Sequence, residues 1–309
     1  MMFDIVGKRF WFFLISGVVI LICIVSLATF KLKTGIEFSS GSTLRVSFEQ
    51  KISQRELEQE LANLGYPNAI VQSAIAPTGE EDYLIRTRRL TEEEAKVQLT
   101  EALAAKFGDI PEPQFYDVSP EVAAETARNA AIAVSIAAIG ILLYITWAFH
   151  RMPKPFHYGV CAIIALVHDV LVALGVFSIL GGVLGWEINL MFITGILAVI
   201  GYSVNNTVVV FDRIRENLAK GAGSSFEVVV NNSLVETLSR SLNTSLTTLF
   251  VVLALLFFVG ASIQNFAVVL LVGIIAGTYS SLFIAPQLLV VWEKGEWGRF
   301  LHPAGSRIR

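Results

Sequence analysis

Residues 10–30 read FWFFLISGVVILICIVSLATF, a stretch that contains no charged side chain. About 20 consecutive apolar residues are enough for a helix to cross the hydrocarbon core of a bilayer. The stretch follows Lys8 and Arg9 and precedes Lys31 and Lys33. It is longer than the apolar region of a cleavable signal peptide, which has about 7–15 residues. We therefore predict a helix that stays in the membrane.

Five further segments have the apolar character of membrane spans. One of them, residues 246–260, is short, so its helix must extend back to about Arg240 to cross the bilayer. The last contains Pro286, which predicts a kink because proline lacks a backbone N–H and its ring clashes with the preceding turn. The six predicted spans are residues 10–30, 130–149, 156–182, 188–211, 240–260 and 266–292.

The composition agrees with a membrane protein. Of 309 residues, 54% are hydrophobic and 16% are charged, whereas a soluble domain has about 25% charged residues. This excludes a soluble enzyme of ordinary type. The net charge of −3 gives no basic excess for nucleic-acid binding. Cys23 and Cys161 both lie in predicted spans, so we interpret them as small buried hydrophobes and expect no disulfide framework.

Lysine and arginine are concentrated in short loops on one side of the predicted spans, and this excess marks the cytoplasmic side. The loops at residues 182–188 and 260–266 contain neither. We therefore predict that both termini are cytoplasmic and that the connection between spans one and two lies outside. The basic residues that set this orientation are Lys8, Arg9, Arg151, Lys154, Arg213, Arg215, Lys220, Arg240, Lys294, Arg299, Arg307 and Arg309.

The connection between spans one and two, residues 31–129, holds 17 acidic and 11 basic residues and contains no histidine or cysteine. Its patterns alternate in the order strand, helix, strand, strand, helix, strand, which is the order of the ferredoxin-like split βαβ fold. Two capping boxes, Ser53-x-x-Glu56 and Thr91-x-x-Glu94, predict where the helices begin. The predicted organisation is a cytoplasmic N-terminus with helix one (1–30), the outer domain (31–122), helices two to six (123–292) and a cytoplasmic tail (293–309).

Asp169 is the only acid inside a predicted span. It follows His157 by about 18 Å of helix, which places it near the membrane centre. An ionisable residue at this depth is a functional candidate, but it can also anchor a neighbouring helix through a hydrogen bond. Both interpretations stay open. His168 is adjacent, and since neighbours on a helix point about 100° apart, the two side chains need not act together.

Spans four and five each place polar residues on one helical face. Two such faces can pair and hold water between them, so they indicate either hydrogen bonding between helices or a path for protons or ions. In span six, Gly273-x-x-x-Gly277 is a weak signal of close packing. The polar residues are Tyr202, Ser203, Asn205, Asn206 and Thr207 in span four, and Arg240, Asn243, Thr244, Thr247 and Thr248 in span five.

Sequence patterns of enzymes are missing. The chain has no His-Glu-x-x-His, no P-loop and no Gly-x-Ser-x-Gly. A single intramembrane acid is too few for an intramembrane aspartyl protease. His157 and His168 lack the clustered partners of a metal site. We therefore expect no enzymatic activity, no cofactor and no bound metal.

Residues 200–217 read IGYSVNNTVVVFDRIREN. This stretch resembles the pattern of the SecF family, which supplies the smaller membrane subunit of the SecDF protein-export complex within the RND superfamily. His168-Asp169-Val170 matches as well, as do residues 35–41 (GIEFSSG) and residues 237–248 (TLSRSLNTSLTT). The resemblance covers nearly the whole chain.

The resemblance implies half of an RND transporter, with six helices and a ferredoxin-like extracytoplasmic domain, in the bacterial plasma (inner) membrane. It implies pairing with SecD and help to the SecYEG channel in translocating preproteins with the proton-motive force. Further implied partners are the small membrane subunit YajC, the translocating preprotein and membrane lipids, but no nucleic acid. The alternative is a stand-alone RND-type exporter of lipids or small molecules, against which the small size of the outer domain argues.

In the family, protons are thought to pass a polar cluster of spans four and five that has the pattern Ser-x-Asn-Asp-Thr. The acid of that pattern maps to Asn206, and its partner arginine maps to Arg240. An amide does not titrate in the relevant range, so Asn206 cannot act as a carboxylate does. The resulting pathway residues are Asn206, Arg240, Asp169, Asn205, Ser203 and Thr244.

Three explanations of Asn206 stay open. Proton coupling has been lost, which would leave a scaffold partner of SecD. Alternatively, Asp169 or an acid on SecD does the work. In the third explanation another ion is used, and Asn206 is one of its oxygen ligands.

Overall fold

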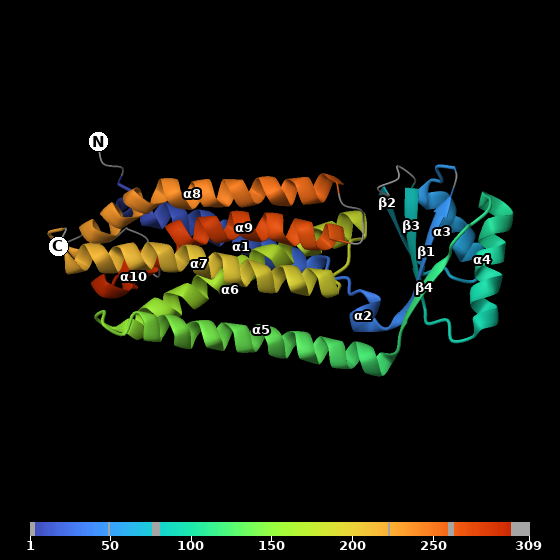
Figure 1. The fold of residues 1–309 in the computed structure, drawn as a ribbon, viewed down its shortest axis with the longest axis horizontal. Helices are drawn as coiled ribbons and strands as arrows, with labels where there is room; N and C mark the ends of the chain where they lie inside the picture. Colours follow the sequence, from blue (N-terminus) through green and yellow to red (C-terminus); the bar gives the residue numbers. More distant parts are fainter. Residues whose placement is uncertain (1–3, 49, 76–80, 222, 259–262, 298–309) are drawn as a thin grey trace, which may run out of the picture.

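The structure is a computed structural model that describes residues 4–48, 50–75, 81–221, 223–258 and 263–297. It has two regions (Figure 1): an elongated bundle of helices and a small α/β domain at one end of it. The start of α1 and the short helix α10 lie at the opposite end of the bundle (Figure 1).

The bundle contains the six predicted spans. Six helical segments among the described residues are long and apolar enough to cross a membrane, which confirms the number of spans. A 3-10 turn, η1 (Val6–Lys8), precedes the first of them. The helices are α1 (Arg9–Thr29), α5 (Pro120–Ala148), α6 (Pro155–Leu184), α7 (Leu190–Ala219), α8 (Phe226–Phe258), α9 (Gln264–Phe283) and α10 (Ala285–Lys294).

The sixth span is interrupted where proline was expected to disturb it. Helix α9 ends at Phe283, and α10 begins at Ala285 with Pro286 in its first turn. Proline fits a first helical turn, where its missing N–H would have no partner in any case. The predicted kink is therefore confirmed.

The fifth span is longer than its apolar run. Helix α8 begins at Phe226 and passes through Arg240 without a break, so the predicted extension of the fifth span back to about Arg240 is confirmed, and the helix continues further than predicted. Residues 226–239 mix apolar and polar side chains, and the helix buries Val230, Leu234 and Ser241 against the bundle. Tertiary packing, which hydropathy does not report, sets the start of the helix.

Small residues let the bundle helices approach one another. A Cβ atom at Gly273 of α9 would clash with Val199 of α7, and one at Gly175 of α6 would clash with Cys23 of α1. The close packing predicted for the Gly273 segment is confirmed. Both cysteines are free and buried, as expected of small hydrophobes.

The α/β domain follows the predicted order of strands and helices. After the short helix α2 (Ile36–Ser39), its sheet has the antiparallel order β2-β3-β1-β4. Its elements are β1 (Gly41–Phe48), α3 (Gln54–Asn63), β2 (Ile70–Ile75), β3 (Glu81–Thr87), α4 (Glu93–Phe107) and β4 (Gln114–Val118). The predicted turn at residues 77–79 lies outside the described residues.

One of the two predicted capping boxes exists. Ser53 and Glu56 form a reciprocal box at the start of α3. The box at Thr91 is wrong, because α4 begins at Glu93 with Glu92 as an N-cap that makes no side-chain bond. Leu90 is buried, and its N–H donates to Ser42 Oγ of β1 (2.8 Å), which fixes the chain just ahead of the helix.

The sheet has two unlike faces. One packs its apolar side chains, among them Leu44, Val46 and Ile85, against Leu57 and Leu103 of the two helices. Those helices lie on the side of the sheet away from the bundle (Figure 1). The other face therefore looks toward the outer ends of the membrane helices.

A short polar junction joins the α/β domain to the bundle. The Gly35 N–H donates to the Ile188 carbonyl (2.7 Å), and the Ile188 N–H donates to the Lys33 carbonyl (2.8 Å). Gln72 of β2 donates to the Gly185 carbonyl (3.1 Å). Arg86 of β3 forms an ion pair with Glu187, which lies in the loop between α6 and α7. The contacts tie the sheet to the loop that starts α7.

Candidate functional site

Asp169 is buried in the centre of the bundle, with 1% of its surface exposed. It is the fifteenth of the 30 residues of α6, so about 21 Å of helix separates it from Pro155. Three helices converge on it, because α6 packs against both α7 and α9.

The carboxylate of Asp169 is fully engaged. Its Oδ2 accepts hydrogen bonds from Ser203 Oγ of α7 (2.5 Å) and from Ser280 Oγ of α9 (2.8 Å). Its Oδ1 lies 3.0 Å from Nδ1 of His168. A Cβ atom at Gly277 would come within 3.0 Å of the Ser203 Cβ, so glycine lets α9 approach α7 closely beside the carboxylate. We call Asp169, His168, Ser203 and Ser280 the buried acid cluster.

The side chain of His168 contacts that of Asp169, a contact that the sequence analysis left open. The 100° between neighbouring Cα–Cβ directions does not prevent contact, since both side chains can turn along the helix axis. The other ring nitrogen, Nε2, is buried without a hydrogen-bond partner among the described residues. His168 also lines an apolar cavity of about 370 Å³ that includes Ser16 of α1 and Tyr279 of α9.

Asn206 is buried three residues after Ser203, with 3% of its surface exposed. Its Nδ2 has no hydrogen-bond partner among the described residues. A buried donor left unsatisfied costs about 1–3 kcal/mol. No hydrogen bond among the described residues joins Asn206 to the buried acid cluster.

Arg240 forms no hydrogen bond with Asn206 within the described residues. It is exposed on α8, and its side chain makes no ion pair or hydrogen bond within the described ranges. The pairing of Asn206 with Arg240 that the resemblance implied is therefore absent from this chain on its own. Asn206 is buried and Arg240 is exposed, which explains why the two side chains do not pair.

The polar face predicted for span five exists and is exposed. Arg240, Asn243, Thr244 and Thr247 all lie on the surface of α8, and we call these four residues the polar stripe. Asn205 of α7 is exposed as well. Thr244 and Thr247 donate only to backbone carbonyls of their own helix, at 2.9 Å each. Such bonds satisfy the hydroxyl hydrogens but leave the polar stripe without a tertiary neighbour among the described residues.

The polar faces of spans four and five meet at one point. Tyr202 Oη of α7 donates to Ser245 Oγ of α8 (3.1 Å), and Ser245 is hydrogen-bonded to Thr278 of α9 (2.6 Å). The prediction that the two faces pair is confirmed for Tyr202 only. Sequence reasoning missed Ser245, Thr278 and Ser280, because small hydroxyl residues are common in apolar helices and carry no periodic signal of their own.

Comparisons with known proteins agree on one family. The model of the family described as "Protein export membrane protein SecD/SecF, C-terminal" matches residues 98–295. Protein translocase subunit SecF of Thermobaculum terrenum is 43% identical over 305 residues, which is 96% of each chain. Protein translocase subunit SecF of Anaerolinea thermophila is 41% identical, again over 96% of each chain.

Fused relatives contain an equivalent of this chain as one part. Protein translocase subunit SecDF of Bacillus subtilis is 36% identical over 95% of this chain and 38% of its own length. The crystal structure of SecDF, a translocon-associated membrane protein from Thermus thermophilus, superposes with a TM-score of 0.82 at 29% identity. That match covers 95% of this chain and 39% of the solved one.

Proposed function

The chain belongs to the SecD/SecF family of protein-export membrane proteins as a SecF-type translocase subunit, and on that premise we propose that Asp169 is the carboxylate through which it uses protons. The observation that supports this most is the burial of a single acid halfway along α6, where hydroxyls from two other helices meet it. Ionisable groups at membrane depth are costly and mark proton relays in pumps and transporters.

The neighbours of Asp169 suit a group that changes protonation state. Serine hydroxyls can donate to a carboxylate or accept from a carboxylic acid, and an imidazole can do either through its tautomers. Ser203, Ser280 and His168 can therefore satisfy the ionised and the neutral form alike. Since they come from α6, α7 and α9, a change of proton would alter the hydrogen bonds that hold these helices together.

We propose that the polar stripe of α8 faces a SecD-type partner. The fused relatives join SecD and SecF in one chain, so a SecD partner is indicated. An arginine exposed to lipid within a span is costly, and a partner that supplies a carboxylate would lower this cost. Asn205 and Thr244 would then belong to the interface, whereas Asp169 and Ser203 would form the path inside this chain.

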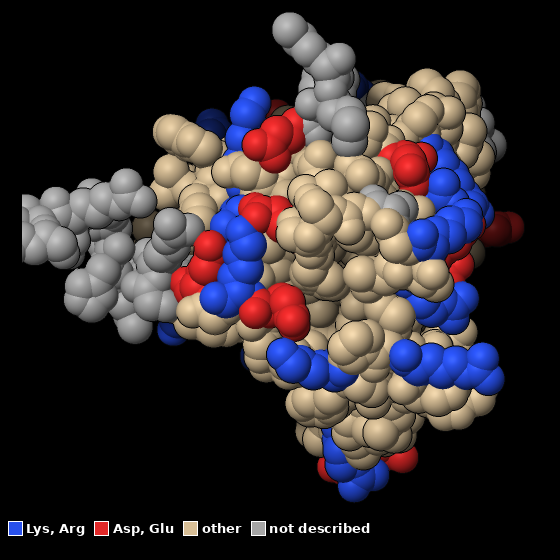
Figure 2. All heavy atoms as spheres, turned by 90° about the vertical axis from the view of Figure 1, so that its left-hand side faces the viewer, with Lys and Arg blue, Asp and Glu red and all other residues tan. Residues whose placement is uncertain are grey.

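The chain is a multi-pass membrane protein by its six apolar helices and its relatives, and we propose that its termini are cytoplasmic. The end of the bundle that lies opposite the α/β domain exposes many lysine and arginine side chains, with acidic side chains between them (Figure 2). This agrees with the excess of basic residues expected on the cytoplasmic side. The α/β domain would then lie outside a bacterial plasma membrane, and its strand order and connections support a ferredoxin-like fold.

The wider assignment follows from the family. We propose that the chain, as half of an RND-type unit, assists the SecYEG channel, together with SecD and the small subunit YajC, in driving preproteins outward. The relatives are named as translocase subunits, which argues against a stand-alone exporter of lipids or small molecules.

A scaffold role is the competing function, and Asn206 favours it. An amide stands where the family usually has its acid, and its buried Nδ2 lacks a partner among the described residues. If coupling was lost with the acid, Asp169 would serve only to fasten three helices.

One experiment separates the two. Membrane vesicles that contain the full chain and its SecD partner are assayed for proton flux and for export, with wild type, Asp169→Asn and Asn206→Asp. We expect Asp169→Asn to lose both activities and Asn206→Asp to leave them unchanged. Normal flux and export in Asp169→Asn would reject Asp169 as the carrier, and a rise of both in Asn206→Asp would show that a carrier had been lost at position 206.

A further inference from the structure

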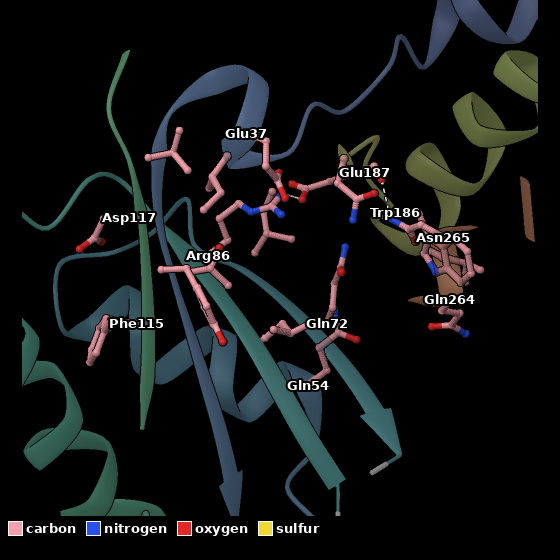
Figure 3. A pocket seen from close by; sticks show the side chains of 18 residues that line it. Glu37, Gln54, Gln72, Arg86, Phe115, Asp117, Trp186, Glu187, Gln264 and Asn265 are labelled. Carbon is pink, nitrogen blue, oxygen red and sulfur yellow. Dashed lines mark hydrogen bonds and ion pairs between the residues drawn. The ribbon is translucent and has the colours of Figure 1, made fainter. Parts of the chain in front are cut away.

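Two cavities among the described residues differ in what surrounds them. The larger, of about 700 Å³, is a polar cleft between the sheet and the outer end of the bundle. Side chains from both regions reach into it (Figure 3). Arg86 forms an ion pair there with Glu187, and Gln72 donates to the Gly185 carbonyl (3.1 Å). These contacts join the α/β domain to the bundle, so the cleft is part of the junction.

The smaller cavity, of about 370 Å³, lies within the bundle and is lined by α1, α6 and α9. Its volume is within the range of ligand-binding sites, about 300–1,000 Å³. Its walls are aliphatic except for Ser16, His168 and Tyr279. Ile15 and Ile275 line it and are exposed, so it opens on the outside of the bundle. In a membrane, such an opening admits apolar molecules from the bilayer.

His168 gives this apolar cavity a polar atom that lacks a partner. The residue is 8% exposed, and its Nδ1 lies 3.0 Å from Asp169 Oδ1. The other ring nitrogen, Nε2, is buried and has no hydrogen-bond partner among the described residues. Tyr279 does not supply one, because its Oη donates to the Phe12 carbonyl (2.7 Å). A buried polar atom left unsatisfied is costly, so a ligand that bonds to Nε2 would be favoured.

The pairing of His168 with Asp169 specifies the group that this ligand must carry. When Asp169 is ionised, the neutral imidazole donates through Nδ1, and Nε2 is an acceptor. When Asp169 is protonated, it can donate to Nδ1, and Nε2 then carries the hydrogen and donates. An ether or carbonyl oxygen only accepts, and an alkyl chain does neither. A hydroxyl can donate and accept, so it satisfies Nε2 in both states.

We propose that the cavity binds a lipophilic alcohol from the membrane, with its alkyl chain against α1 and α9 and its hydroxyl on Nε2 of His168. A water molecule takes about 30 Å³ in the liquid and would leave most of the cavity unfilled. An acyl chain would fill it but leave Nε2 unpaired. A partner helix, about 10–12 Å across with its side chains, is too wide for this volume. The inference goes beyond the proposed function, since binding requires no proton transport.

Photolabelling tests the site. The probe is azi-octanol, an octanol whose diazirine inserts into neighbouring groups on illumination, and the full chain is kept with its SecD partner in vesicles. Adducts are located by mass spectrometry, and we expect them on the residues that line the cavity. Val19→Phe, which puts a ring at the cavity wall, should abolish this labelling. Val18→Phe is the matched control, because Val18 is the exposed neighbour on α1 and does not line the cavity.

Competition tests the hydrogen bond to His168. Octanol should displace the probe at about tenfold lower membrane concentration than nonane, an alkane of the same length, because only the alcohol bonds to Nε2. Equal displacement by the two compounds would overturn the proposal. So would labelling spread evenly over the exposed helices, labelling that persists in Val19→Phe, or no labelling in the presence of SecD. Export and proton flux are measured in the same vesicles without the probe, so failure of the site and failure of the proposed function are recorded separately.

Discussion

The buried acid cluster and the polar stripe are both polar regions at membrane depth, but they differ in how complete they are. Around Asp169, each carboxylate oxygen has a partner, and all partners come from this chain. Along α8, Arg240 and its polar neighbours are exposed and have no tertiary partner among the described residues. One region is therefore complete within this chain, whereas we propose that the other is completed by a second chain.

The largest effect is expected at Asp169, because this substitution tests the self-contained region. Asp169→Asn keeps the size of the side chain and removes its titration. We expect export driven by the proton-motive force to be abolished in vesicles with the SecD partner, while the chain still inserts and folds. Unfolding of the variant, followed by near-ultraviolet circular dichroism in detergent, provides the control for a purely structural defect.

A smaller effect, confined to assembly, is expected at Arg240. Arg240→Met removes the charge but keeps much of the length, so the chain alone should be as stable as wild type. Loss of one partner of a buried charge pair costs about 2–5 kcal/mol, which should appear as weaker association with SecD. Co-purification at graded detergent concentrations measures it. If the variant retained SecD as well as wild type does, the polar stripe would not be the partner-facing surface.

These two regions also show what sequence could and could not supply. Hydropathy identified five spans by their length and the fifth in sequence, whose apolar run is short, by extending it back to about Arg240, and it isolated Asp169 as the single acid within the spans. It gave no reason to select Ser280, since the meeting of α6 and α9 over Gly277 is a property of three-dimensional packing. The resemblance to the family paired Asn206 with Arg240, but in the structure Asn206 is buried and Arg240 is exposed.

The α/β domain shows the same limit on a smaller scale. The alternation in β1 and the box at Ser53 depend on neighbours in sequence, and both were predicted. The box at Thr91 failed because Ser42, far away in the sequence, holds the N–H of Leu90. The cleft between the sheet and the bundle is formed by eight separate segments and has no sequence pattern.

Two adjacent serines on α9, Ser280 and Ser281, allow a matched test of the buried acid cluster. Ser280→Ala removes a hydrogen bond to Asp169, whereas Ser281 bonds the Thr278 carbonyl of its own helix (3.1 Å), so Ser281→Ala is a matched control. We expect Ser280→Ala to lower the free energy of unfolding by about 1–3 kcal/mol and to slow proton flux. Equal losses in the two variants would show that the cluster is not a distinct unit.

The smallest effect is expected outside the membrane, at Asp117 of β4. Burial would raise the pKa of this carboxyl, but hydrogen bonds from Lys96 and Ser42 lower it below its ordinary value. A lowered pKa contributes stability above the unfolded value of about 3.9, and this contribution is lost as pH falls through the folded pKa. Asp117→Asn should therefore cost less than about 1 kcal/mol at pH 7 and less still at pH 3.

Thermal unfolding of the full chain in detergent at the two pH values measures this difference. Asp109→Asn, an exposed acid of the same domain, is the control. A loss that is equal at both pH values would mean that Asp117 acts through packing and not through its charge.

Proton flux through vesicles that contain only this chain and SecD tests the central claim most directly. A pH gradient is imposed across the membrane, and acidification is followed for wild type and Asp169→Asn. If Asp169 carries the proton, the flux of wild type falls to the level of empty vesicles in Asp169→Asn. A variant that conducts protons as fast as wild type would contradict the account.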